Sequence, residues 1–232
     1  MTHPLERAAC TPDPIDPRSF NPHAVLPHGL TVEHIQQAMA EFITFLGFIN
    51  VQLNSRDIPR LETMLMPANF SSIVGEFMIA GIPKYCPSIA KNQYHNGHPD
   101  LIPAGRFPRD EVQYAHEGIE VKGSRYLRGW QGHNPEDIWL MVFIFESNRP
   151  RDAAAGVDPF PFRFIQVLGA QITKGDWTSA GRSPTSRRTP TAAVNDSGYR
   201  KMAANWIYRA PAVPSEIEVA LPEQPAPSNG PG

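Results

Sequence analysis

Three charged residues in the middle of the chain have the types and spacing needed to handle a metal ion and a phosphate. Asp100 ends the segment HPD at 98–100, and Glu120 and Lys122 alternate with apolar residues in GIEVKGSR at 118–125. If the second segment is a strand, Glu120 and Lys122 point to one face, because successive side chains of a strand alternate. With Asp100 arriving from a neighbouring strand, two carboxylates beside an ammonium group would form an oxygen-rich site for Mg²⁺.

Such a site suits the hydrolysis of a phosphodiester bond. A bound metal ion polarises a phosphate oxygen and lowers the pKa of a water molecule. The Lys122 ammonium can orient that water or neutralise charge that develops on the phosphate. Gly123 is expected to let a DNA backbone approach closely. The alternative is that Glu120 and Lys122 are an ordinary surface pair on a strand.

The pattern Pro99-Asp100 followed by Glu120-Val121-Lys122 resembles the P-D-(D/E)-x-K nuclease superfamily, and more narrowly the type II restriction endonucleases. The resemblance covers about residues 71–146. It implies an α/β fold with a restriction-endonuclease-like mixed central sheet flanked by helices. It also implies that the three charged residues are catalytic and that the two carboxylates hold Mg²⁺. Families of this kind often place a further glutamate on a preceding helix, and Glu76 stands at a comparable position as an additional metal ligand.

The activity implied by this resemblance is that of a Mg²⁺-dependent, site-specific deoxyribonuclease that cuts both strands of DNA. Cleavage of two strands related by a dyad favours a homodimer. The resemblance also allows for a cognate DNA methyltransferase that acts on the same site. One departure concerns residues 123–137, where the family usually has a helix, because Gly129, Gly132 and Pro135 disfavour a long helix here.

Other functions remain open at this stage. The chain could be a structure-specific nuclease of repair or phage defence, or a DNA-binding protein without catalysis. A group of histidines near the motif also allows a rival imidazole metal site, including that of a metal-finger nuclease, although the spacings match no zinc signature. These histidines are His95, His98, His116 and His133.

A basic segment later in the chain is expected to hold DNA. Between Arg163 and Arg209 there are eight basic and two acidic residues, in a chain whose formal net charge is −2. Such a local excess is typical of a phosphate-binding face, although a solvated loop would have a similar composition. The residues expected to contact DNA are Arg125, Arg182, Ser183, Thr185, Ser186, Arg187, Arg188 and Thr189.

The 232 residues are expected to form one nuclease domain at 30–209, with the DNA-binding segment at about 173–209. An extended arm at 1–29, outside the core, would precede this domain, and a flexible tail at 210–232 would follow it. The two cysteines suggest no disulfide framework. No apolar run approaches the roughly 20 residues that span a bilayer. We therefore expect a cytoplasmic protein that is not bound to a membrane.

The periodicity of apolar residues predicts the elements of this domain. A helix capped by Thr31 should carry apolar residues through Leu46, and two more helices are expected, the last ending at Gly81 and Pro83. The expected ranges are about 57–66 and 71–79 for these two helices, 98–102, 118–122, 138–145 and 162–172 for strands, and 199–208 for a last short helix.

Overall fold

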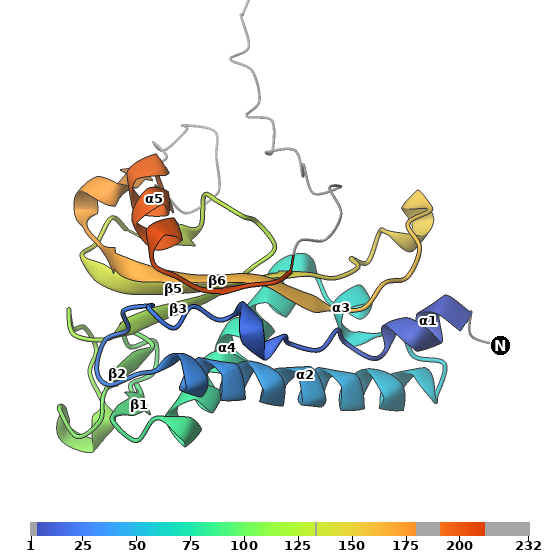
Figure 1. Cartoon of the computed structure of the whole chain (residues 1–232), viewed down its shortest axis with the longest axis horizontal. Coiled ribbons are helices and arrows are strands. Elements are labelled where there is room, and N and C mark those ends of the chain that lie inside the picture. Colours follow the sequence, from blue (N-terminus) through green and yellow to red (C-terminus); the bar gives the residue numbers. More distant parts are fainter. Residues whose placement is uncertain (1–3, 133, 180–190, 212–232) are drawn as a thin grey trace, which may run out of the picture.

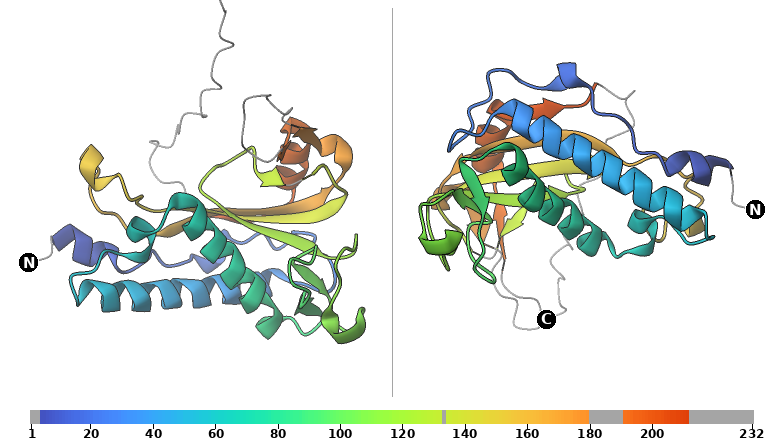
Figure 2. Two further views of the ribbon diagram at one scale, coloured as in Figure 1. Left: turned by 180° about the vertical axis from the view of Figure 1, so that it is seen from behind. Right: turned by 90° about the horizontal axis from the view of Figure 1, so that it is seen from below.

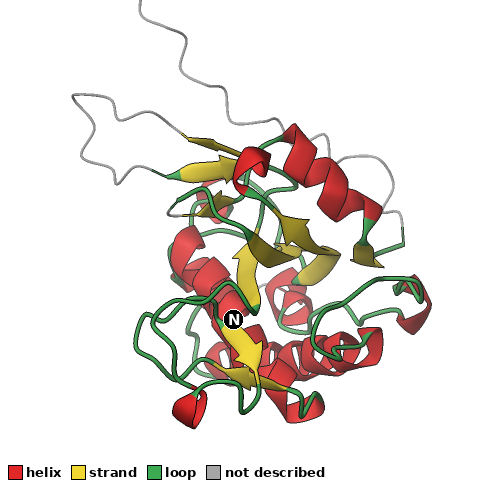
Figure 3. Ribbon diagram, turned by 90° about the vertical axis from the view of Figure 1, so that its left-hand side faces the viewer, coloured by secondary structure: helices red, strands yellow, loops and turns green. Residues whose placement is uncertain are grey.

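The structure, a computed structural model, describes residues 4–132, 134–179 and 191–211. Figure 1 shows a layered arrangement in which two long helices cover one face of a central sheet and helix α5 lies on the other face. Figure 3 shows the strands between these helical layers. Two apolar cores fill the space on the two sides of the sheet. The predicted α/β architecture, a mixed sheet flanked by helices, is therefore confirmed.

The central sheet has six strands in the order β1-β2-β3-β5-β6-β9. Strands β3 and β5 are parallel, and the other neighbours are antiparallel. Strand β5 is buried on both faces: alternate residues such as Met141 and Leu140 belong to the two different cores. The strands are β1 Ile89–Lys91, β2 Leu101–Pro103, β3 Ile119–Ser124, β5 Ile138–Glu146, β6 Arg163–Ile172 and β9 Trp206–Arg209.

The long helices α2 (Val32–Asn54) and α4 (Pro67–Tyr85) lie side by side on one face of this sheet (Figure 2). The Thr31 side chain accepts from the His34 backbone N–H at 3.4 Å, which confirms the predicted cap. The predicted end of α4 at Gly81 and Pro83 was wrong. Pro83 removes only one donor, and the Cys86 N–H still bonds to Ile82 O at 3.1 Å, so the last turn closes.

Other predicted boundaries also changed. The helix expected at 57–66 is reduced to α3 (Leu61–Met64), and the one expected at 199–208 is α5 (Asp196–Ala204) followed by strand β9. Apart from these, the described helical turns are α1 (Pro4–Ala9), η1 (Pro17–Ser19), η2 (Pro108–Asp110), η3 (Ala153–Ala155) and η4 (Lys174–Asp176).

The N-terminal arm contributes to the core, contrary to expectation. Phe20 is 8% exposed, and its ring centroid lies 4.8 Å from that of Tyr208 on β9. Ala9 and Cys10 are each 1% exposed. The sequence did not predict this burial, because isolated apolar residues among prolines have no period. Phe20 is buried because it covers the edge of the sheet at β9.

The described part of the connection from β3 to β5 has no long helix, as Gly129, Gly132 and Pro135 predicted. None of its described residues is helical, and it contains the short strand β4 (Gln131–Gly132). This strand joins a second sheet of order β4-β8-β7, with β7 at Trp177–Ser179 and β8 at Ala192–Val194. The Trp177 indole N–H donates to the Glu136 carbonyl at 2.9 Å, which fixes the end of the connection against the second sheet.

A buried polar network ties the N-terminal helices to the loop after β5. Arg60, which is 1% exposed, donates to Glu62 Oε1, to Asn148 Oδ1 and to Glu6 Oε1, each at 2.8 Å. Glu62 is 0% exposed and also accepts from Asn50 of α2 at 2.9 Å. Because buried charges need partners, removing Arg60 alone would leave the Glu62 carboxylate buried without a cation.

Among the described residues, no helix is both long and apolar enough to cross a membrane.

Candidate catalytic site on strands β2 and β3

Asp100 and Glu120 face each other from adjacent strands. Leu101 of β2 pairs with Ile119 of β3 in antiparallel register, and extending this register by one residue sets Asp100 opposite Glu120. The Val121 backbone N–H donates to Asp100 Oδ2 at 2.8 Å, which fixes the aspartate immediately before β2. The two acidic side chains expected to hold a metal ion therefore lie together.

Lys122 joins this pair from β3. Ile119 and Val121 are buried in the core beneath α4, at 0% and 6% exposure, so Glu120 and Lys122 point to the opposite face as the alternation predicted. Lys122 Nζ donates to Glu120 Oε1 at 2.8 Å. Both side chains are half-buried, with 23% exposure for Lys122 and 17% for Glu120. The ammonium group thus lies directly beside the carboxylates.

His98 and Glu136 complete the site. The sequence indicated His98 only as a member of the histidine group that could form a rival metal site, and it gave no role to Glu136. His98 Nδ1 lies 3.1 Å from Glu120 Oε2, and His98 Nε2 lies 3.1 Å from Glu136 Oε2. The Tyr114 ring stacks on the imidazole with 5.5 Å between centroids. Strand alternation could have found His98, because it lies two residues before Asp100. The sequence held no comparable signal for Glu136, which reaches the site from the β3–β5 connection.

The pKa values of the two carboxylates shift in opposite directions. Burial and the facing Glu120 raise the pKa of Asp100 to about 7. Burial would also raise the pKa of Glu120, but hydrogen bonds from His98 and Lys122 outweigh it and lower that pKa. Burial opposes the charged form of His98, yet its bonds to Glu120 and Glu136 raise its pKa to about 10. Such opposed shifts in one cluster are typical of functional sites.

Asp100 and Glu120 are the two facing carboxylates of this site that could hold a metal ion. Within the described ranges, no group of three or more His, Cys, Asp or Glu side chains is arranged to hold a metal ion. Mg²⁺ in phosphate-transferring enzymes usually keeps several waters and takes one or two carboxylates plus substrate phosphates. Asp100 and Glu120 supply that number, and the repulsion between them is what a divalent cation would relieve.

Glu76, expected as an additional metal ligand, lies on α4 and pairs with Lys91 of β1. The Lys91 Nζ to Glu76 Oε2 distance is 3.2 Å, and the Glu76 side chain is 67% exposed. Its role at the metal stays a prediction.

The raised pKa of Asp100 predicts how the stability of the metal-free protein depends on pH. Between its ordinary value of 3.8 and about 7, the folded protein binds more protons than the unfolded chain, so stability falls as pH rises. The lowered pKa of Glu120 changes the stability only below pH 4.5, and the raised pKa of His98 changes it only above pH 6.5. Among these three groups, Asp100 alone therefore acts between those two pH values.

Asp100→Asn is expected to remove this fall in stability between pH 4.5 and 6.5, the window set by the Glu120 and His98 values. Urea unfolding of both proteins in EDTA, at a series of pH values, measures the effect. If the stability of the variant has the same pH dependence as that of the parent, folding does not raise the pKa of Asp100.

Gly123 has a packing role in place of the expected approach to DNA. A Cβ atom added there would lie 2.3 Å from the Ser71 carbonyl and 3.0 Å from the Val74 Cβ of α4. The missing side chain therefore lets α4 pack directly on β3. This close contact holds the strand that carries Glu120 and Lys122.

Arg125 was expected to contact DNA, but the structure argues against it. Its Nη1 and Nη2 atoms donate to the carbonyls of Ser147 and Asn148 at 2.6 and 3.4 Å. The guanidinium lies 5.4 and 5.0 Å from the ring centroids of Phe70 and Phe145. Burial lowers its pKa to about 10. Arg125 thus joins β3 to the loop after β5.

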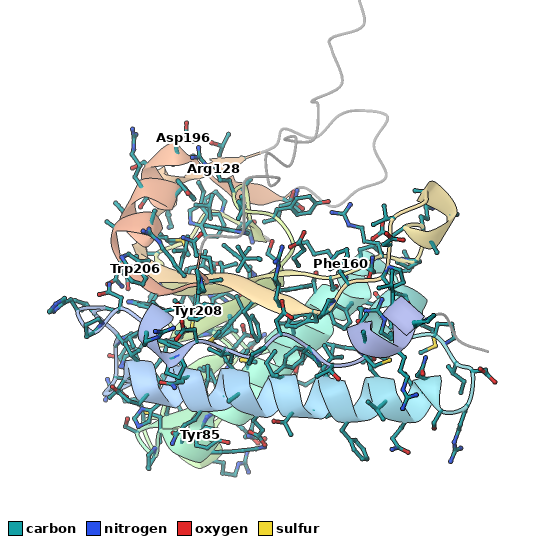
Figure 4. All side chains as sticks on the ribbon, turned by 45° about the vertical axis from the view of Figure 1, so that its right-hand side comes forward. Tyr85, Arg128, Phe160, Asp196, Trp206 and Tyr208 are labelled. Atoms are coloured by element: carbon teal, nitrogen blue, oxygen red, sulfur yellow. The ribbon has the colours of Figure 1, made fainter. Side chains whose placement is uncertain are left out.

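The other residues expected to contact DNA, at 182–189, lie outside the described residues. Some of the basic side chains between Arg163 and Arg209 form ion pairs within the protein. Lys201 donates to Asp176 at 2.5 Å, and Arg163 pairs with Glu146. Figure 4 shows Arg128 near α5, where its guanidinium lies 4.2 Å from the Tyr199 ring centroid. The DNA-binding segment stays a prediction.

No protein-family model, curated protein or solved structure matches this chain.

Proposed function

We propose that this protein is a Mg²⁺-dependent endonuclease that hydrolyses phosphodiester bonds in double-stranded DNA. The observation that carries the proposal is the convergence of Asp100, Glu120 and Lys122 from adjacent strands, with Lys122 Nζ 2.8 Å from Glu120 Oε1. Two oxygen ligands beside an ammonium group suit a metal ion and a phosphate together.

Each residue has a distinct part in this proposal. Asp100 and Glu120 hold Mg²⁺, whereas Glu76 is paired with Lys91 and lies on α4, across the sheet from the Glu120 side chain. The bound ion supplies Lewis-acid polarisation of the phosphate and a water of lowered pKa. The Lys122 ammonium, fixed by Glu120, orients the attacking water or neutralises charge on the phosphate.

The finer assignment follows the type II restriction enzymes that the motif resembles. We propose that cleavage is site-specific and that a homodimer matches the dyad of its site. A cognate DNA methyltransferase acting on the same site belongs to this assignment.

The proposal predicts metal-dependent cleavage of DNA that carries no base modification. Purified protein is incubated with amplified linear DNA and plasmid DNA, in Mg²⁺ or in EDTA, and the products are separated on a gel. Cleavage in Mg²⁺ and intact DNA in EDTA are expected. Salt-sensitive binding that is insensitive to EDTA, without cleavage, would favour a non-catalytic DNA-binding protein. Cutting confined to flaps or mismatches would favour a structure-specific nuclease.

A further inference from the structure

The imidazole of His98 bridges two carboxylates that belong to different parts of the chain. Its Nδ1 and Nε2 atoms lie 3.1 Å from Glu120 Oε2 and from Glu136 Oε2, respectively. A carboxylate ion can only accept hydrogen bonds, so both ring nitrogens act as donors in this arrangement. Neither nitrogen is then free to ligate a metal ion, which argues against the rival imidazole site for this histidine.

His98 is held firmly enough to orient its partners. Its backbone N–H donates to Gln113 O at 3.1 Å, and its carbonyl accepts from the Ala115 N–H at 2.9 Å. The Tyr114 ring covers one face of the imidazole, with an interplanar angle of 21°. Three consecutive residues of the segment before β3 therefore fix the position and plane of the ring.

Glu136 is held just as directly at the other end. Its carbonyl accepts from the Trp177 indole at 2.9 Å, and the next side chain, Asp137, accepts from the Lys174 backbone N–H at 2.8 Å. These two bonds fasten the end of the β3–β5 connection to η4 and β7. The Glu136 carboxylate thus reaches His98 from a fixed backbone, with a side chain that is only 17% exposed.

We propose that Glu136 and His98 are positioning residues that hold Glu120 ready to bind the metal ion of the proposed nuclease. Lys122 bonds to one oxygen of Glu120 and His98 bonds to the other. The plane of the carboxylate is therefore set from both sides. Each oxygen keeps a second acceptor position, and Asp100 lies across the strand pair. Outer partners of metal ligands commonly change metal affinity or activity by about 10–100-fold.

The inference rests on the proposed function, so its test includes metal binding without DNA or catalysis. Mn²⁺ binding to the whole protein is measured by electron paramagnetic resonance, and the Mg²⁺ concentration that gives half-maximal cleavage is measured separately. His98→Gln cannot bridge both carboxylates in the imidazole geometry, and Glu136→Ala removes the outer partner. Both variants are expected to weaken Mn²⁺ binding and raise the Mg²⁺ requirement by about 10-fold. Glu136→Gln keeps an acceptor and is expected to recover much of the loss.

The matched control is Glu117→Ala, because Glu117 lies on the same segment before β3 but pairs with Arg106 at 2.9 Å. It should bind Mn²⁺ as the parent does. Parent-like Mn²⁺ affinity in both His98→Gln and Glu136→Ala would overturn the inference, as would an equal loss in Glu117→Ala. A variant that only lowers the melting temperature would assign a structural role instead.

The two proposals can fail separately. A parent that binds Mn²⁺ but cuts no DNA ends the nuclease proposal, while the Mn²⁺ comparison still decides the roles of His98 and Glu136. A parent that cuts DNA, with variants that need no more metal, ends the inference alone. A parent that binds no Mn²⁺ overturns both.

Discussion

Lys122→Met is expected to slow DNA cleavage by about 100-fold or more at saturating Mg²⁺, the loss typical when one group that stabilises developing charge is removed. Methionine keeps much of the volume of the side chain but has no ammonium group. The Lys122 Nζ contact to Glu120 Oε1 at 2.8 Å places that group beside the carboxylate expected to hold the ion. Single-turnover cleavage rates measure the effect, and DNA affinity measured in Ca²⁺ should change much less.

The control for this variant is Lys84→Met. Lys84 also pairs with a glutamate, Glu41, with 2.6 Å between Nζ and Oε1, but it lies on α4 and is 55% exposed. This variant should cut at the parent rate. Cleavage by Lys122→Met at the parent rate would remove Lys122 from the reaction, and an equal loss in both variants would show that the effect is not specific to the site.

Arg60→Ala is expected to lower the free energy of unfolding by about 3–5 kcal/mol, because it leaves a buried carboxylate without its cation. Glu62 is 0% exposed, and Arg60 Nη1 lies 2.8 Å from its Oε1. Urea unfolding measures the change. Arg56→Ala, at an exposed position shortly before Arg60 in the chain, should change the free energy by less than about 0.5 kcal/mol.

A double variant distinguishes the loss of the ion pair from the loss of packing. Arg60→Met with Glu62→Leu replaces both charges by apolar groups of similar size, and such replacements are often close to neutral. We expect the double variant to be more stable than Arg60→Ala. If Arg60→Ala unfolds at the parent urea concentration, the network does not hold the N-terminal helices to the loop after β5.

The parts of the fold that the sequence predicted well are those with a long, regular period. Helix α2 repeats apolar residues over many turns and begins at a capping Thr31, and β5 is a continuous apolar run. The alternation in β3 correctly placed Glu120 and Lys122 on one face. These features depend on local geometry, which a single sequence records.

The features that the sequence did not reveal depend on contacts between distant segments. Phe20 is buried because β9 comes to lie beside it. Arg125 and Gly123 looked suited to DNA, but Phe70, Phe145 and the backbone of α4 occupy the space around them. No local pattern shows which surface a side chain will meet after folding, so these roles appear only in three dimensions.

The contact between His98 and Glu136 is of the same kind. His98 precedes β2, whereas Glu136 ends a connection that begins after β3, and only the sheet order brings them within 3.1 Å. The sequence indicated the two strands of the candidate site through Asp100 and Glu120. It held no signal for Glu136, which reaches the site from the β3–β5 connection.

The most direct test compares the parent with Asp100→Asn on unmodified genomic DNA in Mg²⁺, followed by sequencing of all fragment ends. A site-specific nuclease that uses Asp100 should give discrete fragments from the parent, with a shared sequence at their ends, and leave the DNA intact in the variant. Intact DNA from the parent, or the same fragments at the same rate from Asp100→Asn, would contradict the proposed function.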